Sequence, residues 1–195
     1  MKEMILSNGV KIPCFGYGTF RLSDEESCVK GIRDAVETGY RLIDTASFYK
    51  NEEIVGRGIR KCGLPREELF ITTKVWASER GYKPTLESFE TSMKKLGLEY
   101  LDLFLIHWPT SEARFSDWEE LNRGSWQALT ELYKQGRVRS IGVSNFLEHH
   151  LKALMETEIR PMVNQLEIHP GYPQLEIMDY CQKNGIVVEA WSPLV

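Results

Sequence analysis

An aspartate and a tyrosine five residues apart carry the first sign of chemistry in this sequence. Residues 40–43 predict a short buried strand, Asp44 is the first charged residue past its apolar core, and Tyr49 lies in the loop that follows. A carboxylate at the end of a buried strand needs a cation or hydrogen-bond donors, because burying it unpaired costs several kcal/mol. A structural aspartate beside a packing tyrosine explains the pair equally well, so the pair alone does not distinguish a catalytic role from a structural one.

The elements around this pair alternate regularly along the chain. Asn8-Gly9 between two apolar runs predicts a β-hairpin, and a capping box at Ser23–Glu26 predicts the start of the first helix. Strands are expected at 15–18, 40–43, 69–73, 101–106, 140–143, 162–165 and 186–190. Helices are expected after each strand but the last, among them one beginning at Pro84 and one spanning 118–135. Such alternation with nearly continuous apolar strands is typical of a parallel sheet covered by helices.

Most of the predicted strands end in a polar or aromatic residue. In a (β/α)₈ barrel these ends converge on one mouth, where the active sites of such barrels lie. A doubly wound sheet would instead bind a dinucleotide at a G-x-G-x-x-G turn, and Gly16-Tyr-Gly18 and Gly56-Arg-Gly58 do not match that pattern. The barrel is therefore favoured. The strand-end residues are Asp44, Lys74, His107, Ser144, Asn164 with Gln165, and Trp191.

Composition excludes several classes of protein. With 195 residues, 42% of them apolar and 27% charged, the chain is expected to form a single globular domain over residues 1–195. A net charge of −4 without a basic stripe argues against nucleic acid as a partner, and no apolar run is long enough to cross a membrane. The N-terminus lacks the apolar region of a signal peptide, which predicts a cytoplasmic protein.

Cysteine and histidine spacing gives no indication of a metal site. Cys14, Cys28, Cys62 and Cys181 are widely and irregularly spaced, which predicts reduced thiols rather than disulfides or a zinc site. The tandem His149-His150 is expected to be a solvated helix start.

Six segments of the sequence resemble the aldo-keto reductase family, and the resemblance covers the whole chain. The first is Gly39-Tyr-Arg-Leu-Ile-Asp-Thr-Ala-Ser-Phe-Tyr-Lys-Asn-Glu52, which is similar to the signature segment of the family. The others follow in the order and spacing of the family: the strand end at Lys74, Leu105-Ile-His-Trp-Pro109, Ile141-Gly-Val-Ser-Asn145, Asn164-Gln165 and Ala190-Trp-Ser-Pro-Leu194. The details are most similar to small prokaryotic members that reduce diketogluconates, glyoxals and related carbonyls.

The resemblance implies a catalytic tetrad of Asp44, Tyr49, Lys74 and His107. Reduction of a carbonyl by hydride needs an acid to protonate the forming alkoxide, and a tyrosine with a pKa near 10 needs tuning for that task. The Lys74 ammonium would lower the pKa of Tyr49, Asp44 would keep Lys74 charged, and His107 would polarise the carbonyl oxygen. Taken singly, a strand-end histidine is more often structural and a strand-end lysine is usually solvated; the four together favour catalysis.

The resemblance also implies an NADPH site without a Rossmann fold and a pocket for a small carbonyl substrate. Ser144, Asn145 and Gln165 would bind the nicotinamide carboxamide, and the Trp191 ring would stack on the nicotinamide. Asp44 is expected beside the cofactor as well. Gly18 and Thr19 would lie along the ribose-phosphate side, and Ser192 and Leu194 along the pyrophosphate. An aromatic wall of Phe20, Trp76 and Trp108, with His107, would line the substrate pocket, although Trp76 could equally be a packing residue.

The length of the chain departs from that of the family. A complete barrel of this type needs about 250 residues, and this sequence stops just past the seventh strand, so the expected fold is an incomplete (β/α)₈ barrel with an N-terminal β-hairpin. The segment that grips the adenosine 2′-phosphate in the family has no counterpart, so the preference for NADP over NAD comes from the relatives. The complete protein is expected to be a monomer, whereas a chain ending here would present open sheet edges that invite oligomerisation.

Three functions follow as hypotheses. The first is an NAD(P)H-dependent reductase of small aldehydes and ketones, with Tyr49 as general acid. The second is a dinucleotide-binding barrel that regulates without turnover, and the third is an inactive fragment of a longer reductase. The presence of all four tetrad residues favours the reductase.

Overall fold

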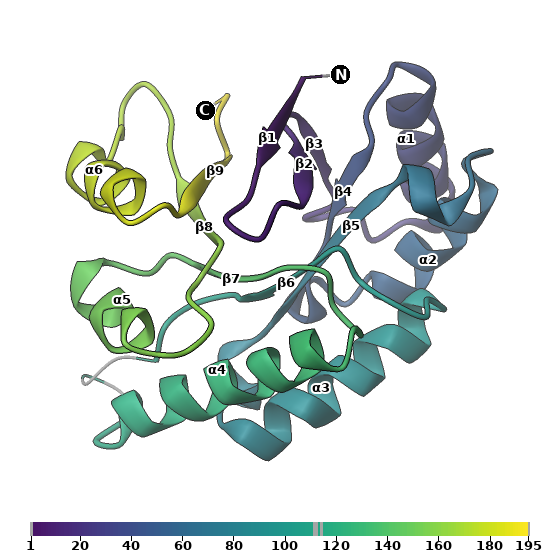
Figure 1. Cartoon of the computed structure of the whole chain (residues 1–195). Coiled ribbons are helices and arrows are strands. Elements are labelled where there is room, and N and C mark those ends of the chain that lie inside the picture. Colours follow the sequence, from purple (N-terminus) through teal and green to yellow (C-terminus); the bar gives the residue numbers. More distant parts are fainter. Residues whose placement is uncertain (1, 111–112, 114, 195) are drawn as a thin grey trace.

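The computed structural model describes residues 2–110, 113 and 115–194. Its main feature is a curled sheet of seven parallel strands that follow one another in chain order, β3-β4-β5-β6-β7-β8-β9 (Figure 1). The strands are β3 (Gly16–Gly18), β4 (Leu42–Asp44), β5 (Phe70–Val75), β6 (Leu103–Ile106), β7 (Ile141–Ser144), β8 (Val163–Glu167) and β9 (Val187–Trp191). Strand neighbours in the sheet are also neighbours in sequence, as in a (β/α)₈ barrel, and the sheet forms the larger part of such a barrel.

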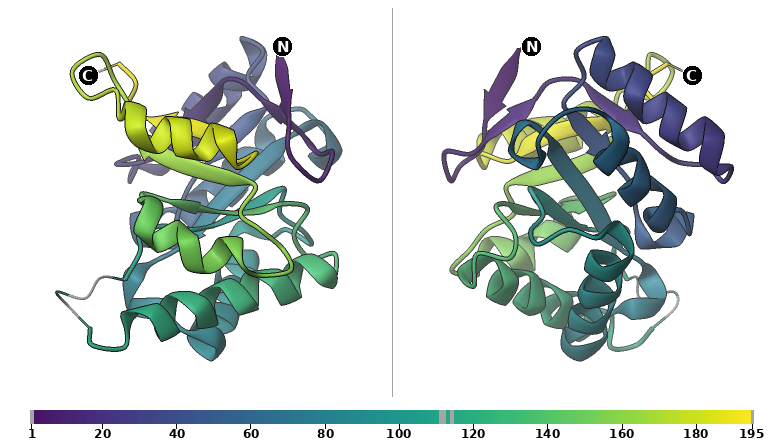
Figure 2. Two further views of the ribbon diagram at one scale, coloured as in Figure 1. Left: turned by 60° about the vertical axis from the view of Figure 1, so that its left-hand side comes forward. Right: turned by 90° about the vertical axis from the view of Figure 1, so that its right-hand side faces the viewer.

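Helices cover the outer face of the curled sheet, as two further views show (Figure 2). Each connects two successive strands, and neighbouring helices pack against one another from α1 to α5. The helices are α1 (Glu25–Glu37), α2 (Glu52–Lys61), α3 (Tyr82–Leu96), α4 (Trp118–Lys134), α5 (Glu148–Met155) and α6 (Leu175–Lys183), with short 3₁₀ turns η1 (Ser47–Tyr49), η2 (Arg66–Glu68) and η3 (Ala77–Glu79). The apolar strands have helices on one side and barrel interior on the other, and every residue of β5, β6 and β7 is buried.

The close approach of α2 to α3 depends on a glycine. A Cβ atom at Gly56 would lie 2.3 Å from the carbonyl oxygen of Leu96, well inside van der Waals contact. Only glycine therefore permits this helix packing.

The two amino-terminal strands form the predicted hairpin. β1 (Glu3–Ile5) pairs antiparallel with β2 (Lys11–Pro13), and Gly9 in the turn has a φ of +85°. The Asn8 side chain donates a 2.9 Å hydrogen bond to the carbonyl of Arg139, just before β7 begins. The hairpin is therefore anchored at the amino-terminal end of the sheet, opposite the end where the strand-end residues lie.

A buried aspartate ties the amino ends of the strands together. The Asp102 side chain is completely buried just before β6 and accepts hydrogen bonds from Ile71 N at 2.9 Å, Arg66 at 2.6 Å and Arg139 at 2.7 Å. Two cations and a backbone donor thus compensate the loss of hydration of this carboxylate. The arrangement links η2, β5, β6 and the segment that leads into β7.

Three details of the secondary structure differ from the sequence-based expectation. The first helix is capped by Asp24, whose Oδ2 accepts a 2.8 Å bond from Ser27 N, and not by Ser23. The third helix begins at Tyr82, two residues before Pro84, because Gly81 with its φ of +93° starts the turn. The first strand of the sheet, β3, is largely exposed, whereas a strand of a helix-covered parallel sheet is expected to be buried, because β3 is an edge strand in this structure.

Candidate active site

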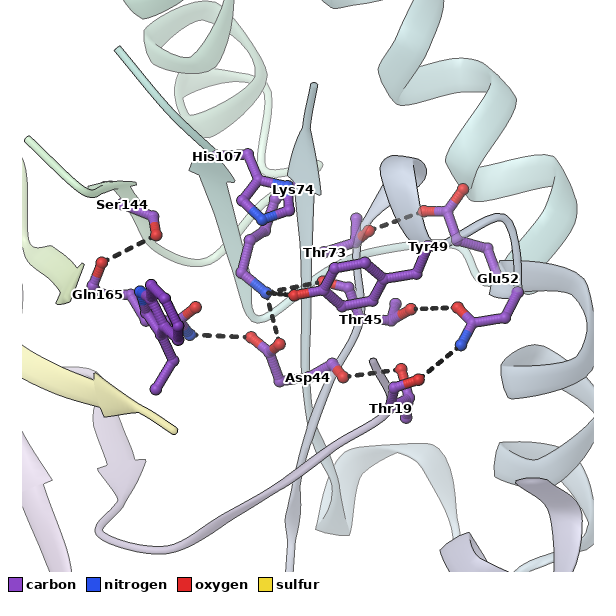
Figure 3. A network of polar contacts seen from close by, with 12 residues as sticks. Thr19, Asp44, Thr45, Tyr49, Glu52, Thr73, Lys74, His107, Ser144 and Gln165 are labelled. Atoms are coloured by element: carbon purple, nitrogen blue, oxygen red, sulfur yellow. Dashed lines mark hydrogen bonds and ion pairs between the residues drawn. The ribbon is translucent and has the colours of Figure 1, made fainter. Parts of the chain in front are cut away.

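Lys74 lies at the centre of a polar cluster at the carboxyl ends of β4 and β5 (Figure 3). Its side chain is completely buried, and its ammonium forms an ion pair with Asp44 and donates a 3.0 Å hydrogen bond to the carbonyl of Thr45. The Tyr49 hydroxyl lies 3.5 Å from the same nitrogen. The second oxygen of Asp44 accepts a 2.9 Å bond from Gln165 on β8. Asp44, Tyr49 and Lys74 are therefore brought together as the sequence predicts.

Burial and charge act in opposite directions on the two protonatable partners. Burial opposes the charge of the Lys74 ammonium, but Asp44 and Tyr49 outweigh it, and the pKa of Lys74 lies above its ordinary value. Burial of Tyr49 raises the pKa of its phenol, and the nearby ammonium lowers it by less, so the net pKa of Tyr49 is raised. The expected contribution of Lys74 is present, but the expected net decrease in the pKa of Tyr49 is not found, because desolvation is the larger effect.

His107 follows β6 and faces Tyr49 and Trp76. The ring centroids of His107 and Tyr49 are 5.6 Å apart and nearly perpendicular, at 78°. Burial, together with the positive charges of Lys74 and Arg80, lowers the pKa of His107 to about 3. The imidazole is therefore neutral at physiological pH, and in that state it can donate one hydrogen bond without carrying a charge.

A second hydrogen-bond chain holds the loop that carries Tyr49. The Asn51 side chain is buried, accepts a 2.9 Å bond from Thr45 and donates to the carbonyls of Thr19 at 2.8 Å and Leu22 at 3.1 Å. Glu52 beside it accepts a 2.7 Å bond from Thr73 on β5. Asn51 and Glu52 form the start of α2 and also fix η1 against the sheet, a role that a helix-start pattern does not indicate.

Polar side chains and an indole gather at the ends of β7, β8 and β9. Trp191 Nε1 donates a 2.9 Å bond to Asn145 Oδ1, and the Asn145 amide donates to the carbonyl of His107 at 2.9 Å and to Ser144 Oγ at 3.0 Å. The Ser144 hydroxyl in turn donates to the carbonyl of Gln165 at 2.8 Å. Asn145 has a φ of +63°, a left-handed conformation that asparagine tolerates better than most residues. Ser144, Asn145, Gln165 and Trp191 thus form one connected group beside Asp44.

The other residues expected along a cofactor occupy different environments. Thr19 is completely buried, and its hydroxyl donates a 3.0 Å bond to the carbonyl of Asp44. Gly18 is exposed, with no atom within 4 Å of where a Cβ would lie. Ser192 and Leu194 follow β9 and are exposed, Leu194 almost completely at 97%.

Aromatic side chains pack against the rings of Tyr49 and His107. Phe20 packs on Tyr49 with ring centroids 5.0 Å apart, and Trp76 meets His107 edge to face at 5.1 Å. Phe48, which was not among the expected site residues, stacks on Trp76 at 3.9 Å and is 43% exposed. Trp108 is exposed at 42%, and none of the aromatic contacts found among the described residues involves it.

One acidic residue at this end of the sheet was not among the expected site residues. The Glu189 carboxyl oxygen Oε2 is buried without a hydrogen-bond partner in the part of the chain that the structure describes. Glu189 is paired in register with Gln165 and interacts electrostatically with Asp44 and Lys74. Strand alternation could have revealed it, because side chains two residues apart point to the same face and Trp191 was already expected to face the site.

The tandem histidines lie at the start of α5 as predicted, but only His149 is exposed. His150 is buried, not solvated, and its Nδ1 accepts a 3.1 Å bond from Leu147 N, which caps α5. Burial lowers the pKa of His150 to about 4, so the buried ring is neutral. Within the described ranges, no group of three His, Cys, Asp or Glu side chains is placed to hold a metal ion. No helix in those ranges has the length and apolar character that a membrane crossing needs.

A curled parallel sheet with acidic, basic, phenolic and imidazole groups at its carboxyl ends has the architecture of the barrel oxidoreductases. The aldo/keto reductase family profile matches residues 14–195. The chain belongs to the aldo/keto reductase family.

Curated relatives support this assignment over nearly the whole chain. The sequence is 51% identical over 191 residues to a glyoxal reductase of Bacillus subtilis, covering 97% of this chain and 66% of that protein. It is 49% identical to a 9,11-endoperoxide prostaglandin H2 reductase of Trypanosoma cruzi, covering 97% of this chain and 64% of the relative. The chain thus spans about two thirds of the length of the curated relatives it matches.

Solved structures agree in fold. An aldo/keto reductase from Brucella melitensis superposes with a TM-score of 0.92 at 43% identity, covering 99% of this chain and 73% of that one. A Bombyx mori aldo-keto reductase in complex with NADP gives a TM-score of 0.89 at 36% identity, covering 98% of this chain and 66% of that one. The expected barrel of aldo-keto reductase type, with seven of its strands and an N-terminal hairpin, is therefore confirmed.

Proposed function

We propose that this chain carries the active site of an NADPH-dependent reductase that converts small aldehydes and ketones, such as glyoxals and keto-sugars, to alcohols. The observation that carries the proposal is the buried Lys74 ammonium, paired with Asp44 and 3.5 Å from the Tyr49 hydroxyl. A cation beside a phenol is the arrangement that a tyrosine acid needs, because it stabilises the phenolate left after proton donation. The relatives named a glyoxal reductase and a prostaglandin endoperoxide reductase support a reductive reaction.

The residues at the ends of β7, β8 and β9 fit a nicotinamide. A carboxamide needs both a donor and an acceptor: the side-chain oxygens of Ser144, Asn145 and Gln165 can accept, and the Gln165 amide has a second N–H besides the one that it donates to Asp44. The flat Trp191 ring, half-buried and fixed by its bond to Asn145, offers a stacking surface next to them. Gly18, Thr19, Asp44, Ser192 and Leu194 remain our candidates for the rest of the dinucleotide, and the NADP complex of the Bombyx mori relative favours NADP over NAD.

In the proposed reaction, the protein binds, orients and protonates the substrate. The bound cofactor would supply a hydride to the carbonyl carbon. Neutral His107 would donate a hydrogen bond to the carbonyl oxygen as negative charge develops there, and Tyr49 would transfer its proton to that oxygen. Lys74 would stabilise the resulting phenolate until it is reprotonated, and Asp44 would keep Lys74 charged. Phe20, Trp76 and Trp108 are proposed to line the pocket and exclude water, with the neighbouring Phe48 stacked on Trp76.

We also propose a single domain over residues 1–195, a cytoplasmic location and a monomeric state for the complete protein. No partner other than the small carbonyl substrate and the dinucleotide is proposed.

Deuterium transfer tests the proposed reaction directly. The chain is incubated with methylglyoxal and NADPH deuterated at the reactive ring carbon, and the product is analysed by mass spectrometry. We expect an alcohol with deuterium on the carbinol carbon. NADPH binding without labelled alcohol would favour the regulatory barrel, and neither binding nor product would favour an inactive fragment.

A further inference from the structure

The proposed active site contains one more carboxyl group than the tetrad requires. Glu189 on β9 is paired in register with Gln165 on β8, and Gln165 donates a 2.9 Å hydrogen bond to Asp44, the partner of Lys74. The charges of Asp44 and Lys74 both act on Glu189. Lys74 in turn lies 3.5 Å from the Tyr49 hydroxyl, and the negative charge of Glu189 raises the pKa of Tyr49, although burial and the charges of Lys74 and Asp44 weigh more. Asp44, Lys74, Tyr49 and Gln165 are thus the groups that face Glu189 from the neighbouring elements.

Charge balance distinguishes the two carboxyls. Asp44 forms the ion pair with Lys74 through one oxygen and accepts the Gln165 hydrogen bond with the other, so both of its oxygens have partners. Oxygen Oε2 of Glu189 is buried and has no partner among the described residues. One buried ammonium can neutralise one carboxylate, and a second ionised carboxylate at the same place is disfavoured by desolvation and by repulsion from the first. The spare proton of the cluster therefore belongs on Glu189.

We propose that Glu189 is a positioning residue of the reductase site, a second carboxyl beside the Asp44–Lys74 pair whose charge state tunes how readily Tyr49 gives up its proton. The inference rests on the proposed function, since it concerns the acid strength of the same tyrosine. Glu189 touches neither substrate nor reacting atoms in this account and acts through Lys74 and Tyr49.

The direction of the effect follows from the signs of the charges. Burial, followed by the negative charge of Asp44, raises the pKa of Glu189 from 4.5 to about 7. An ionised Glu189 raises the pKa of Tyr49 and so weakens it as an acid. Below pH 7 Glu189 is protonated, so its negative charge no longer offsets the lowering of the Tyr49 pKa by Lys74. Reduction is therefore expected to slow as the pH rises through about 7.

The test uses the full 195-residue chain and two NMR-active labels, one at the Tyr ring carbon Cζ and one at the Glu carboxyl carbon Cδ. Tyr49→Phe assigns the Tyr49 signal, and Glu189→Gln removes the charge of Glu189 while keeping its shape. In wild type, we expect the Glu189 signal to titrate at about pH 7. In Glu189→Gln, we expect the pKa of Tyr49 to shift downward. Glu156→Gln removes the same charge from an exposed position on the surface and should leave the pKa of Tyr49 unchanged.

Two results would overturn the inference: a Glu189 carboxyl that titrates at its ordinary value, or a Tyr49 pKa that is the same in Glu189→Gln and Glu156→Gln. If Glu189→Gln does not fold, two measurements still test the inference. One is the titration of Glu189 in wild type, and the other is the pKa of Tyr49 in Glu189→Asp, which moves the carboxyl without removing it. In turnover, the fall in rate across pH 7 should be absent from Glu189→Gln and present in Glu156→Gln. The NMR measurements need no turnover, so a chain that reduces no carbonyl but shows both NMR results would refute the proposed function and leave the coupling of Glu189 to Tyr49 standing.

Discussion

Removing one member of the buried pair between Asp44 and Lys74 should destabilise the fold strongly, and removing both should cost much less than the sum. The Lys74 side chain is completely buried and the Asp44 side chain is 13% exposed. Losing one partner of such a pair typically costs about 3–5 kcal/mol, because the other charge remains buried without compensation. Asp44 keeps its 2.9 Å bond from Gln165, so we expect about 3 kcal/mol for Lys74→Met.

A double-mutant cycle measures the coupling directly. Lys74→Met, Asp44→Asn and the double variant are unfolded in urea at neutral pH, with tryptophan fluorescence as the readout. We expect a coupling free energy of about 2–3 kcal/mol, the upper part of the range for contacting residues. The matched control is the exposed pair of Asp179 and Lys183 on α6, for which Lys183→Met and Asp179→Asn should couple by no more than about 0.5 kcal/mol. A coupling as small as that of the control would refute the buried pair.

Three further predictions concern the supports of the fold and site. Asn51→Ala removes three hydrogen bonds of a buried side chain and should lower the free energy of unfolding by about 2–3 kcal/mol, measured in urea. Asp102→Ala leaves Arg66 and Arg139 without their buried partner and should cost about 3–5 kcal/mol in the same assay; a loss below about 1 kcal/mol would contradict the network. His150 has a pKa of about 4 in the folded chain and 6.5 as its ordinary value. Between these values the unfolded chain binds a proton that the folded chain does not, so the free energy of unfolding falls as the pH is lowered from 6.5 to 4. His150→Asn should reduce that fall, and an unchanged pH dependence would show that the ring is not held neutral.

The strands, their order and the strand-end residues could be predicted because local patterns encode them. Near-continuous apolar runs such as 101–106 mark strands buried on both faces, and parallel strands bring their carboxyl ends together. Asp44, Lys74 and His107 therefore followed from their position in the sequence. The contact of Tyr49 with Lys74 was expected from the resemblance, and the structure brings the two groups together.

What could not be predicted depends on neighbours that are distant in sequence. The buried state of His150 and the direction of the pKa shift of Tyr49 are set by packing that no local pattern shows. The bonds of Asn51 to the β3–α1 connection cross about thirty residues, so a helix-start motif gave no hint of them. Glu189 is the charged residue of an otherwise apolar predicted strand, and the strand pattern alone assigns it no role. Its spacing of two residues from Trp191 does place both side chains on the same face.

The most direct test of the central claim is the turnover of Tyr49→Phe on methylglyoxal with NADPH. The substitution removes one oxygen atom and keeps the ring that packs against Phe20 and His107. Tyr40→Phe, a half-buried tyrosine just before β4, serves as the matched control. We predict that Tyr49→Phe binds NADPH as wild type does and reduces methylglyoxal at least about 100-fold more slowly, while Tyr40→Phe keeps wild-type activity. Turnover by Tyr49→Phe at the wild-type rate would contradict the assignment of Tyr49 as the acid.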